Sequence, residues 1–320
     1  MRFVYVMDPM DRVLPDKDTT FAIQRAAERM GHASLHCTPR DVYVEGGDVW
    51  ARVRPLHVGD LPPHFTLESA VDVRLADVDC VFIRKDPPFD AQYLYLTQLL
   101  EVVRGRTLVV NDPRGLRDAN EKLYTLHFVR HMPKTLVASD RDRIHRWVSE
   151  VGTAVVNPLD GAGGSGVMVV SKGDRNSRSI VDYITAEGTR HAMVQEYLPA
   201  VRAGDKRVLL LDGEVLGAIN RVPREDDVRS NIHVGGRVEP CSVTPDERAV
   251  VADLRPRLNA DGLVFVGLDF IGGKLTEVNV TSPTGIQELS RHLGRDAAEN
   301  VVDWVVRHVS PAAGTARLPP

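Results

Sequence analysis

The sequence predicts an α/β domain at the N-terminus followed by a larger α+β region. Strands and helices alternate over the first third of the chain, and hairpins with helices between them follow. A chain of 320 residues is also long for a single hydrophobic core. We therefore expect two packed domains.

The N-terminal region, residues 1–115, has the alternation typical of a small parallel sheet with helices on its faces. The expected elements are strands at residues 2–7, 79–84 and 107–111, helices at 19–30 and 91–103, and a hairpin at 42–53 around Gly46 and Gly47. Such a sheet has a crevice at the carboxyl ends of its strands, which is where ligands bind.

From residue 116 the pattern changes to hairpins with helices packed on them. The expected elements are helices at residues 116–129, 142–151 and 179–187, strands at 134–138 and 193–198, and a hairpin at 207–219 around Asp212 and Gly213. A charged, aperiodic loop at residues 223–237 is typical of a lid. We divide the chain into residues 1–115, 116–199, 200–310 and a flexible tail at 311–320.

The composition excludes several classes of partner. A formal net charge of −4 offers no electrostatic argument for binding nucleic acid or an anionic membrane. No segment approaches the roughly 18 apolar residues of a membrane helix. The three cysteines, Cys37, Cys80 and Cys241, are far apart in sequence, which argues against a disulfide framework and fits a reducing cytosol. We therefore expect a soluble, cytoplasmic protein.

A glycine-rich stretch at residues 155–170 contains the spacing G-x-G-x-x-G in Gly161, Gly163 and Gly166. A dinucleotide-binding turn would need a helix directly after the last glycine, because the helix N-terminus holds the pyrophosphate. Residues 167–170 read instead as a strand, so the stretch is a hairpin connection. Its backbone N–H groups can wrap a phosphate chain, but from this stretch alone a hairpin tip without a ligand is an equally good interpretation.

A second polar pattern lies on a hairpin around Gly272 and Gly273. Glu277 and Asn279 are two residues apart on a strand, so both face one side, and their oxygens suit Mg²⁺. Asp269 on the partner strand joins them only if the loop has an odd number of residues, because a two-residue turn would place it on the other face. The spacing therefore predicts a metal site on this condition, with a solvated polar strand face as the alternative.

Several long motifs in one order resemble the prokaryotic-type glutathione synthetases of the ATP-grasp superfamily. The motifs are R-K-D-P-P-F-D (84–90), N-D-P-x-x-L-R-D-x-N-E-K-L (111–123), P-L-D-G-x-G-G (158–164), G-D-K-R-V-L (204–209) and L-T-E-V-N-V-T-S-P-T (275–284). The resemblance implies a Rossmann-like, pre-ATP-grasp α/β domain followed by an α+β ATP-grasp domain of two subdomains. It implies ligation of γ-glutamylcysteine to glycine through an acyl phosphate, with ATP and Mg²⁺ or Mn²⁺ as cofactors. It also implies a homo-oligomer, tetramer or dimer.

The resemblance further implies roles for individual residues. The metal ligands would be Asp269, Glu277 and Asn279. The catalytic contacts to the transferring phosphoryl group or the substrate would be Arg207, Arg221, Arg229 and Asn231. The ATP contacts would be Lys122, Asn157, Asp160, Gly161, Gly163, Gly164, Ser165, Gln195, Glu196, Tyr197, Leu198 and Asp205. The substrate contacts would be Ser282, Thr284 and Arg84, although Arg84 suits a structural ion pair equally well.

One position departs from the family pattern. The family has lysine in the segment V-x-K-P-L-D-G, where this chain has Asn157, and an amide supplies no charge to the ATP phosphates. The loss of one charge-assisted contact costs roughly 1.5–3 kcal/mol, or about ten- to a hundredfold in affinity or rate. Three interpretations stay open: a glutathione synthetase, a ligase for another γ-glutamyl dipeptide and amine, and a nucleotide-binding protein without catalysis.

Overall fold

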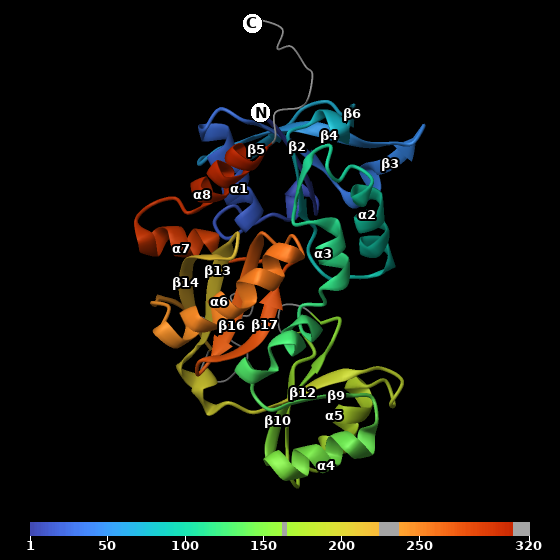
Figure 1. Ribbon diagram of the computed structural model, residues 1–320, viewed down its shortest axis with the longest axis vertical. Coiled ribbons are helices and arrows are strands. Elements are labelled where there is room, and N and C mark those ends of the chain that lie inside the picture. Colours follow the sequence, from blue (N-terminus) through green and yellow to red (C-terminus); the bar gives the residue numbers. More distant parts are fainter. Residues whose placement is uncertain (162–164, 224–236, 310–320) are drawn as a thin grey trace, which may run out of the picture.

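The computed structural model describes residues 1–161, 165–223 and 237–309. Three sheets follow one another along the long axis of the molecule (Figure 1). An eight-stranded sheet lies at one end, a five-stranded sheet in the middle and a four-stranded sheet at the other end. From the N-terminal domain the chain runs to the four-stranded sheet at the far end and then returns to form the five-stranded sheet in the middle. The four-stranded and five-stranded sheets are therefore neighbours along the long axis (Figure 1).

The N-terminal sheet has a parallel core, as predicted, extended by antiparallel strands on one side. The parallel strands are β1 (Arg2–Met7), β2 (Ala33–Cys37), β7 (Cys80–Arg84) and β8 (Leu108–Val110), and the helices are α1 (Thr19–Arg29) and α2 (Ala91–Glu101). The antiparallel strands are β3 (Val42–Glu45), β4 (Asp48–Val58), β5 (Phe65–Leu67) and β6 (Val71–Arg74). Phe3 to Val6 are fully buried, which explains why β1 is a continuous apolar run rather than an alternating one.

The helix predicted for residues 116–129 is wrong, because the chain is interrupted there. The structure has a short α3 (Pro113–Asp118), a turn, and a 3-10 helix η4 (Leu123–His131). The Asn120 side chain explains the break, since its Oδ1 accepts hydrogen bonds from the backbone N–H groups of Lys122 (3.1 Å) and Leu123 (3.0 Å). Lys122 therefore lies on the turn between two helices and not on a helix surface.

The four-stranded sheet is antiparallel and covered by two helices. Its elements are β9 (Thr135–Ala138), α4 (Arg141–Val151), β10 (Thr153–Pro158), β11 (Met168–Ser171), α5 (Ser177–Ile184) and β12 (Ala192–Glu196). Because β10 and β11 pair directly, the glycine-rich stretch connects two strands of a hairpin, as predicted. Residues 162–164 of that connection lie outside the described residues.

The five-stranded sheet carries the remaining polar motifs. Its elements are β13 (Asp205–Leu211), β14 (Glu214–Val222), β15 (Arg237–Pro240), α6 (Pro245–Ala260), β16 (Phe265–Ile271) and β17 (Lys274–Asn279). The chain then forms α7 (Ile286–Leu293) and α8 (Ala298–His308), and α8 packs against α1 of the N-terminal domain (Figure 1). Short 3-10 helices complete the structure at η1 (Met10–Arg12), η2 (Pro39–Asp41), η3 (Leu75–Asp77) and η5 (Pro199–Ala203).

The hairpin β16–β17 has a two-residue turn, Gly272 and Gly273, with φ angles of 56° and 76°. We expected such a turn to separate Asp269 from Glu277. That expectation is wrong, because a β-bulge next to Asp269 shifts the register by one residue and leaves Asp269 opposite Glu277. The hydroxyl of Thr276, the extra residue, donates a hydrogen bond to the Asp269 carbonyl oxygen (3.1 Å).

No helix among the described residues is long and apolar enough to span a bilayer. The predicted boundaries at residues 115, 199 and 310 stay predictions.

Candidate active site

A cavity of about 500 Å³ is lined by residues of all three parts of the chain. The N-terminal domain contributes its loops at residues 12–18 and 86–87. The four-stranded sheet contributes Asn157 and the segment after β12, and the five-stranded sheet contributes β13, β14, β16 and β17. The polar motifs that lie far apart in the sequence therefore meet at one place.

Asp269 lies at the centre of a buried ion network in this cavity. Its Oδ1 accepts from Arg207 Nε (2.5 Å), and its Oδ2 accepts from Arg207 Nη2 (2.8 Å). Arg221 Nη2 lies 3.0 Å from the same Oδ2 and donates to Asp205 Oδ2 (2.6 Å). Burial raises the pKa of Asp269, but the two guanidinium groups outweigh burial and hold this pKa well below its ordinary value. Asp269 is therefore ionised.

Close packing at Gly267 allows this arrangement. Gly267 is two residues before Asp269 on β16, and a Cβ atom there would lie 2.9 Å from Arg207 Cδ. A larger residue at this position would displace the Arg207 side chain, which donates two hydrogen bonds to Asp269. Close packing against Arg207 thus explains why the motif G-L-D begins with glycine.

Glu277 has a less complete set of partners than Asp269. Lys122 Nζ donates to Glu277 Oε1 (3.1 Å) and also to the Gly161 carbonyl oxygen (2.7 Å). Burial raises the pKa of Glu277, and Lys122 offsets this effect only in part. Lys122 thereby connects the β16–β17 hairpin to the start of the glycine-rich connection. The Glu277 carboxylate is left short of positive charge.

Asn279 completes a donor set suited to a hard cation. Its Nδ2 donates to Asp269 Oδ2 (3.2 Å) and to the Gly267 carbonyl oxygen (3.3 Å), which turns the amide oxygen away from these acceptors. Within the described ranges, no three His, Cys, Asp or Glu side chains gather as a metal cluster. A cation here would therefore have two carboxylates and one amide from the protein, which fits Mg²⁺ bound together with phosphates and water.

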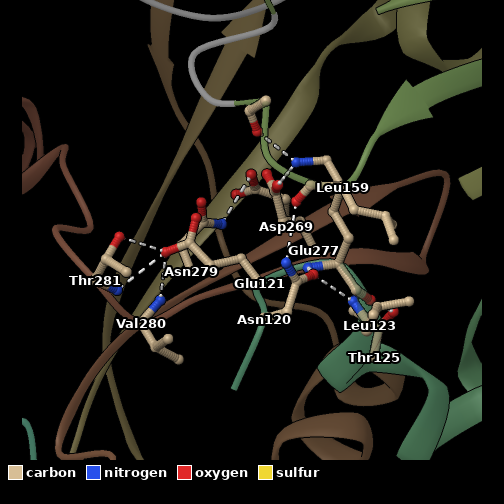
Figure 2. A network of polar contacts seen from close by, with 12 residues as sticks. Asn120, Glu121, Leu123, Thr125, Leu159, Asp269, Glu277, Asn279, Val280 and Thr281 are labelled. Atoms are coloured by element: carbon tan, nitrogen blue, oxygen red, sulfur yellow. Dashed lines mark hydrogen bonds and ion pairs between the residues drawn. The ribbon is translucent and has the colours of Figure 1, made fainter. Parts of the chain in front are cut away.

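Glu121, which the sequence analysis did not select, holds the chain that follows β17 (Figure 2). Its Oε1 accepts from the backbone N–H groups of Val280 (2.9 Å) and Thr281 (3.0 Å) and from the Thr281 hydroxyl (2.7 Å). Its neighbour Asn120 donates to the Leu159 carbonyl oxygen (3.0 Å). No sequence pattern signals this role, because it depends on backbone groups about 160 positions away along the chain.

The wall formed by the four-stranded sheet is mostly uncharged. Val155, Val169 and Met193 line it together with the polar side chains of Asn157, Gln195 and Glu196, of which Glu196 alone is acidic. Lys134 and Lys172, two of the nearest lysines in sequence, do not line the cavity, whereas Lys122 does. Among the described lining residues, Lys122 is thus the lysine closest in sequence to Asn157.

Most of the predicted site residues line the cavity, and a few do not. Those that do are Lys122, Asn157, Gly161, Ser165, Gln195, Glu196, Tyr197, Leu198, Asp205, Arg207, Arg221, Asp269, Glu277, Asn279, Ser282 and Thr284. Asp160 is instead exposed, 4.0 Å from Arg190. Gly163, Gly164, Arg229 and Asn231 lie outside the described residues, as does most of the predicted lid.

Arg84 is buried beside the cavity rather than in its lining. Its Nε donates to the Thr20 hydroxyl (3.0 Å) and its Nη2 to the Pro283 carbonyl oxygen (3.0 Å). Arg84 therefore holds the loop that carries Ser282 and Thr284.

Comparison with known proteins identifies the family. The model for the prokaryotic glutathione synthetase N-terminal domain matches residues 1–117, and the model for the prokaryotic glutathione synthetase ATP-grasp domain matches residues 121–294. The chain belongs to the prokaryotic glutathione synthetase family. The glutathione synthetase of Synechocystis is 43% identical, with 95% of this chain and 99% of the relative covered. That of Gloeobacter violaceus is 44% identical, with 98% of each chain covered.

Solved structures agree on the fold. D-cycloserine synthetase DcsG superposes with a TM-score of 0.64 at 17% identity and covers 96% of this chain and 99% of its own. The ATP-grasp ligase PsnB, solved with Mg and ADP, superposes with a TM-score of 0.63 at 18% identity and covers 96% and 98%. The α/β domain followed by an ATP-grasp domain is confirmed, and the chain is an ATP-dependent carbon–nitrogen ligase of the glutathione synthetase family.

Proposed function

We propose that this cavity joins γ-glutamylcysteine to glycine at the expense of ATP, with Asp269, Glu277 and Asn279 holding Mg²⁺. The observation that carries the assignment is the register of β16 and β17, which places two carboxylates opposite each other. Such a pair is unfavourable without positive charge. Here Arg207, Arg221 and Lys122 supply part of that charge. Mg²⁺ bound at this site would neutralise the ATP phosphates and supply the remainder.

The reaction has two steps. A cysteinyl carboxylate oxygen attacks the γ-phosphorus of ATP, the bond to the β-phosphate oxygen breaks, and ADP leaves. The glycine amine then attacks the acyl carbon, inorganic phosphate leaves, and the nitrogen loses a proton. Because water would hydrolyse the acyl phosphate, the cavity must exclude it between the steps.

Arg207 and Arg221 are suited to the phosphoryl group during this transfer. Both guanidinium groups are buried and both are fixed by Asp269, so their remaining N–H donors do not have to reorganise. Arg207 Nη1 also lies 3.3 Å from the Thr284 carbonyl oxygen. Arg207 is thus placed between the metal hairpin and the loop proposed to bind the substrate.

The nucleotide is proposed to lie along the four-stranded sheet. Its uncharged wall suits adenine, and the backbone at Gln195 to Leu198 would meet the base edge. Asp205 would meet the ribose while it anchors Arg221. Lys122 would reach the phosphates, and Ser282 and Thr284 the substrate.

Three finer statements are proposals from the resemblance and from general chemistry. The site is proposed to accept Mn²⁺ in place of Mg²⁺, because the same oxygen ligands suit both ions. The cytoplasm is proposed as the location because Cys37, Cys80 and Cys241 are all free thiols. A homo-oligomer, tetramer or dimer, is expected.

The test is an ADP-release assay with γ-glutamylcysteine and glycine against other γ-glutamyl dipeptides and amines. We expect the highest kcat/KM with γ-glutamylcysteine and glycine. A clear preference for another pair would replace the substrate assignment. ATP binding without turnover of any pair would contradict the ligase mechanism in this cavity.

A further inference from the structure

Glu288 is a buried carboxylate that no step of the proposed reaction uses. It lies in the first turn of α7 and lines the same cavity, with only 6% of its surface exposed. Its Oε2 is buried and has no hydrogen-bond partner among the described residues. A buried carboxylate oxygen without a hydrogen-bond donor is unfavourable, because it has lost its contacts with water and gained no other contact in return.

The other oxygen of Glu288 is paired on the outside of the helix. Oε1 lies 3.2 Å from Arg291 Nη2, one turn further along α7, and the Arg291 side chain is more than half exposed. Only the Arg291 end of this pair is exposed, and its contact is to Oε1, so it supplies no donor to Oε2. The first turn of the helix favours a negative charge, but that field is also too weak to replace a missing partner. The inner oxygen therefore remains uncompensated.

The first turn of α7 is held so that Glu288 cannot easily rotate out to water. Gln287 Nε2 donates to the carbonyl oxygens of Pro15 (3.0 Å) and Asp18 (2.6 Å) in the N-terminal domain. The loop that includes these residues lines the cavity through Arg12, Lys17 and Asp18. Glu288 is thus fixed at the N-terminal side of the cavity, on a different element from the metal hairpin.

We propose that Glu288 binds the primary ammonium group of an amino-acid substrate. This inference rests on the proposed function, in which two substrates carry such a group: the α-ammonium of the γ-glutamyl residue and the amine of glycine. An ammonium group is a compact cation with several N–H donors, so it satisfies a buried carboxylate oxygen and cancels its charge. The carboxylate is costly in the free protein and becomes compensated when substrate is bound.

The experiment compares wild type, Glu288→Gln and Arg291→Met. Arg291→Met removes the outer partner of Glu288, and with it a hydrogen bond to the Asp16 carbonyl oxygen (3.2 Å), without changing a cavity-lining residue, and it is the matched control. We expect Glu288→Gln to raise the KM of one amino substrate by about tenfold or more. The KM of ATP should stay within about twofold of wild type, and the melting temperature without substrate should be equal or higher. Arg291→Met should leave all KM values unchanged.

A second donor substrate distinguishes the two ammonium groups. Glutarylcysteine differs from γ-glutamylcysteine only by lacking the α-ammonium. If Glu288 binds the donor, wild type loses affinity for glutarylcysteine and Glu288→Gln causes no further loss. If Glu288 binds glycine, the variant raises the KM of glycine equally with both donors.

Two results would overturn the inference. One is unchanged KM values for both amino substrates in Glu288→Gln. The other is a lower melting temperature together with a parallel rise of every KM, which would mean a structural role. Failure of the proposed function gives a different result, because wild type itself would then not turn over this pair. In that case the thermal shift caused by γ-glutamylcysteine or by glycine, in wild type against Glu288→Gln, still decides the inference without turnover.

Discussion

The two sheets that face the cavity differ in the side chains they present. The five-stranded sheet presents a dense ion network around Asp269, whereas the four-stranded sheet presents mostly uncharged side chains, with Glu196 as its one acidic residue among the described lining residues. The five-stranded sheet is therefore suited to phosphoryl transfer, and the four-stranded sheet to contact with the uncharged adenine base. The difference teaches that positive charge for the phosphates must come from elsewhere than the four-stranded sheet: from the five-stranded sheet, from Lys122, from Arg12 and Lys17 of the N-terminal loop, and from bound metal.

Asp269→Asn tests the charged wall and should have the largest effect. The substitution removes the negative charge that the buried guanidinium groups of Arg207 and Arg221 both contact. We expect the free energy of unfolding to fall by about 3–5 kcal/mol and the turnover to fall by on the order of a thousandfold. Urea denaturation and ADP release measure the two effects.

Glu277→Gln is the matched control for Asp269→Asn. Glu277 has one lysine partner, a pKa raised by burial, and a partly exposed side chain. We expect an activity loss of similar order but a change in the free energy of unfolding below about 1 kcal/mol. Equal destabilisation by the two variants would show that the network does not distinguish the two carboxylates.

The contrast between these two carboxylates was only partly visible in the sequence. The polar pattern at residues 269–279 predicted their shared face, but the turn geometry argued against it. The bulge at Thr276 reverses that argument, and it depends on local twist and a hydroxyl contact rather than on residue type. Buried apolar runs, in contrast, predicted three of the four parallel strands of the N-terminal domain, since burial on both faces leaves a direct trace in composition. The fourth, β2, was not predicted, because its buried run is interrupted by the polar Ser34 and His36.

The roles of Glu121 and Glu288 could not be predicted from a pattern in the sequence. Each depends on neighbours brought together by the tertiary structure, and a lone glutamate on a helix or turn is usually solvated. The predicted helix at residues 116–129 failed for a related reason, because the Asn120 side chain competes with the helix for backbone N–H groups. That break is what presents Glu121 and Lys122 to the site.

Removal of divalent metal should have the next largest effect. Among the described residues, five basic and eight acidic side chains line the cavity, so acids outnumber bases by three. A triphosphate adds further negative charge, and we expect its affinity to fall on the order of a hundredfold or more in EDTA. Calorimetric titration with ATP measures it, and added Mg²⁺ should restore binding. Equal affinity with and without metal would show that protein cations suffice.

Asn157→Lys alters the uncharged wall. A lysine there would add positive charge beside the proposed phosphate path, and we expect kcat/KM for ATP to rise about ten- to a hundredfold. Asn157→Met is the control, since it fills similar volume without charge and should give no gain. No change in the lysine variant would mean that another group already supplies this contact.

Glu121→Gln should have the smallest effect and tests whether the charged wall also orders the loop after β17. The amide oxygen still accepts hydrogen bonds, but three donors from Val280 and Thr281 are weaker against a neutral acceptor than against a carboxylate. We expect the ratio of ADP released to tripeptide formed to rise roughly two- to fivefold, because a looser substrate loop exposes the acyl phosphate to water. The KM of ATP should not change, since Lys122 is retained. Thr281→Val removes one of the three donors and should raise the ratio less. A rise in the KM of ATP with an unchanged ratio would instead assign Glu121 to the nucleotide side.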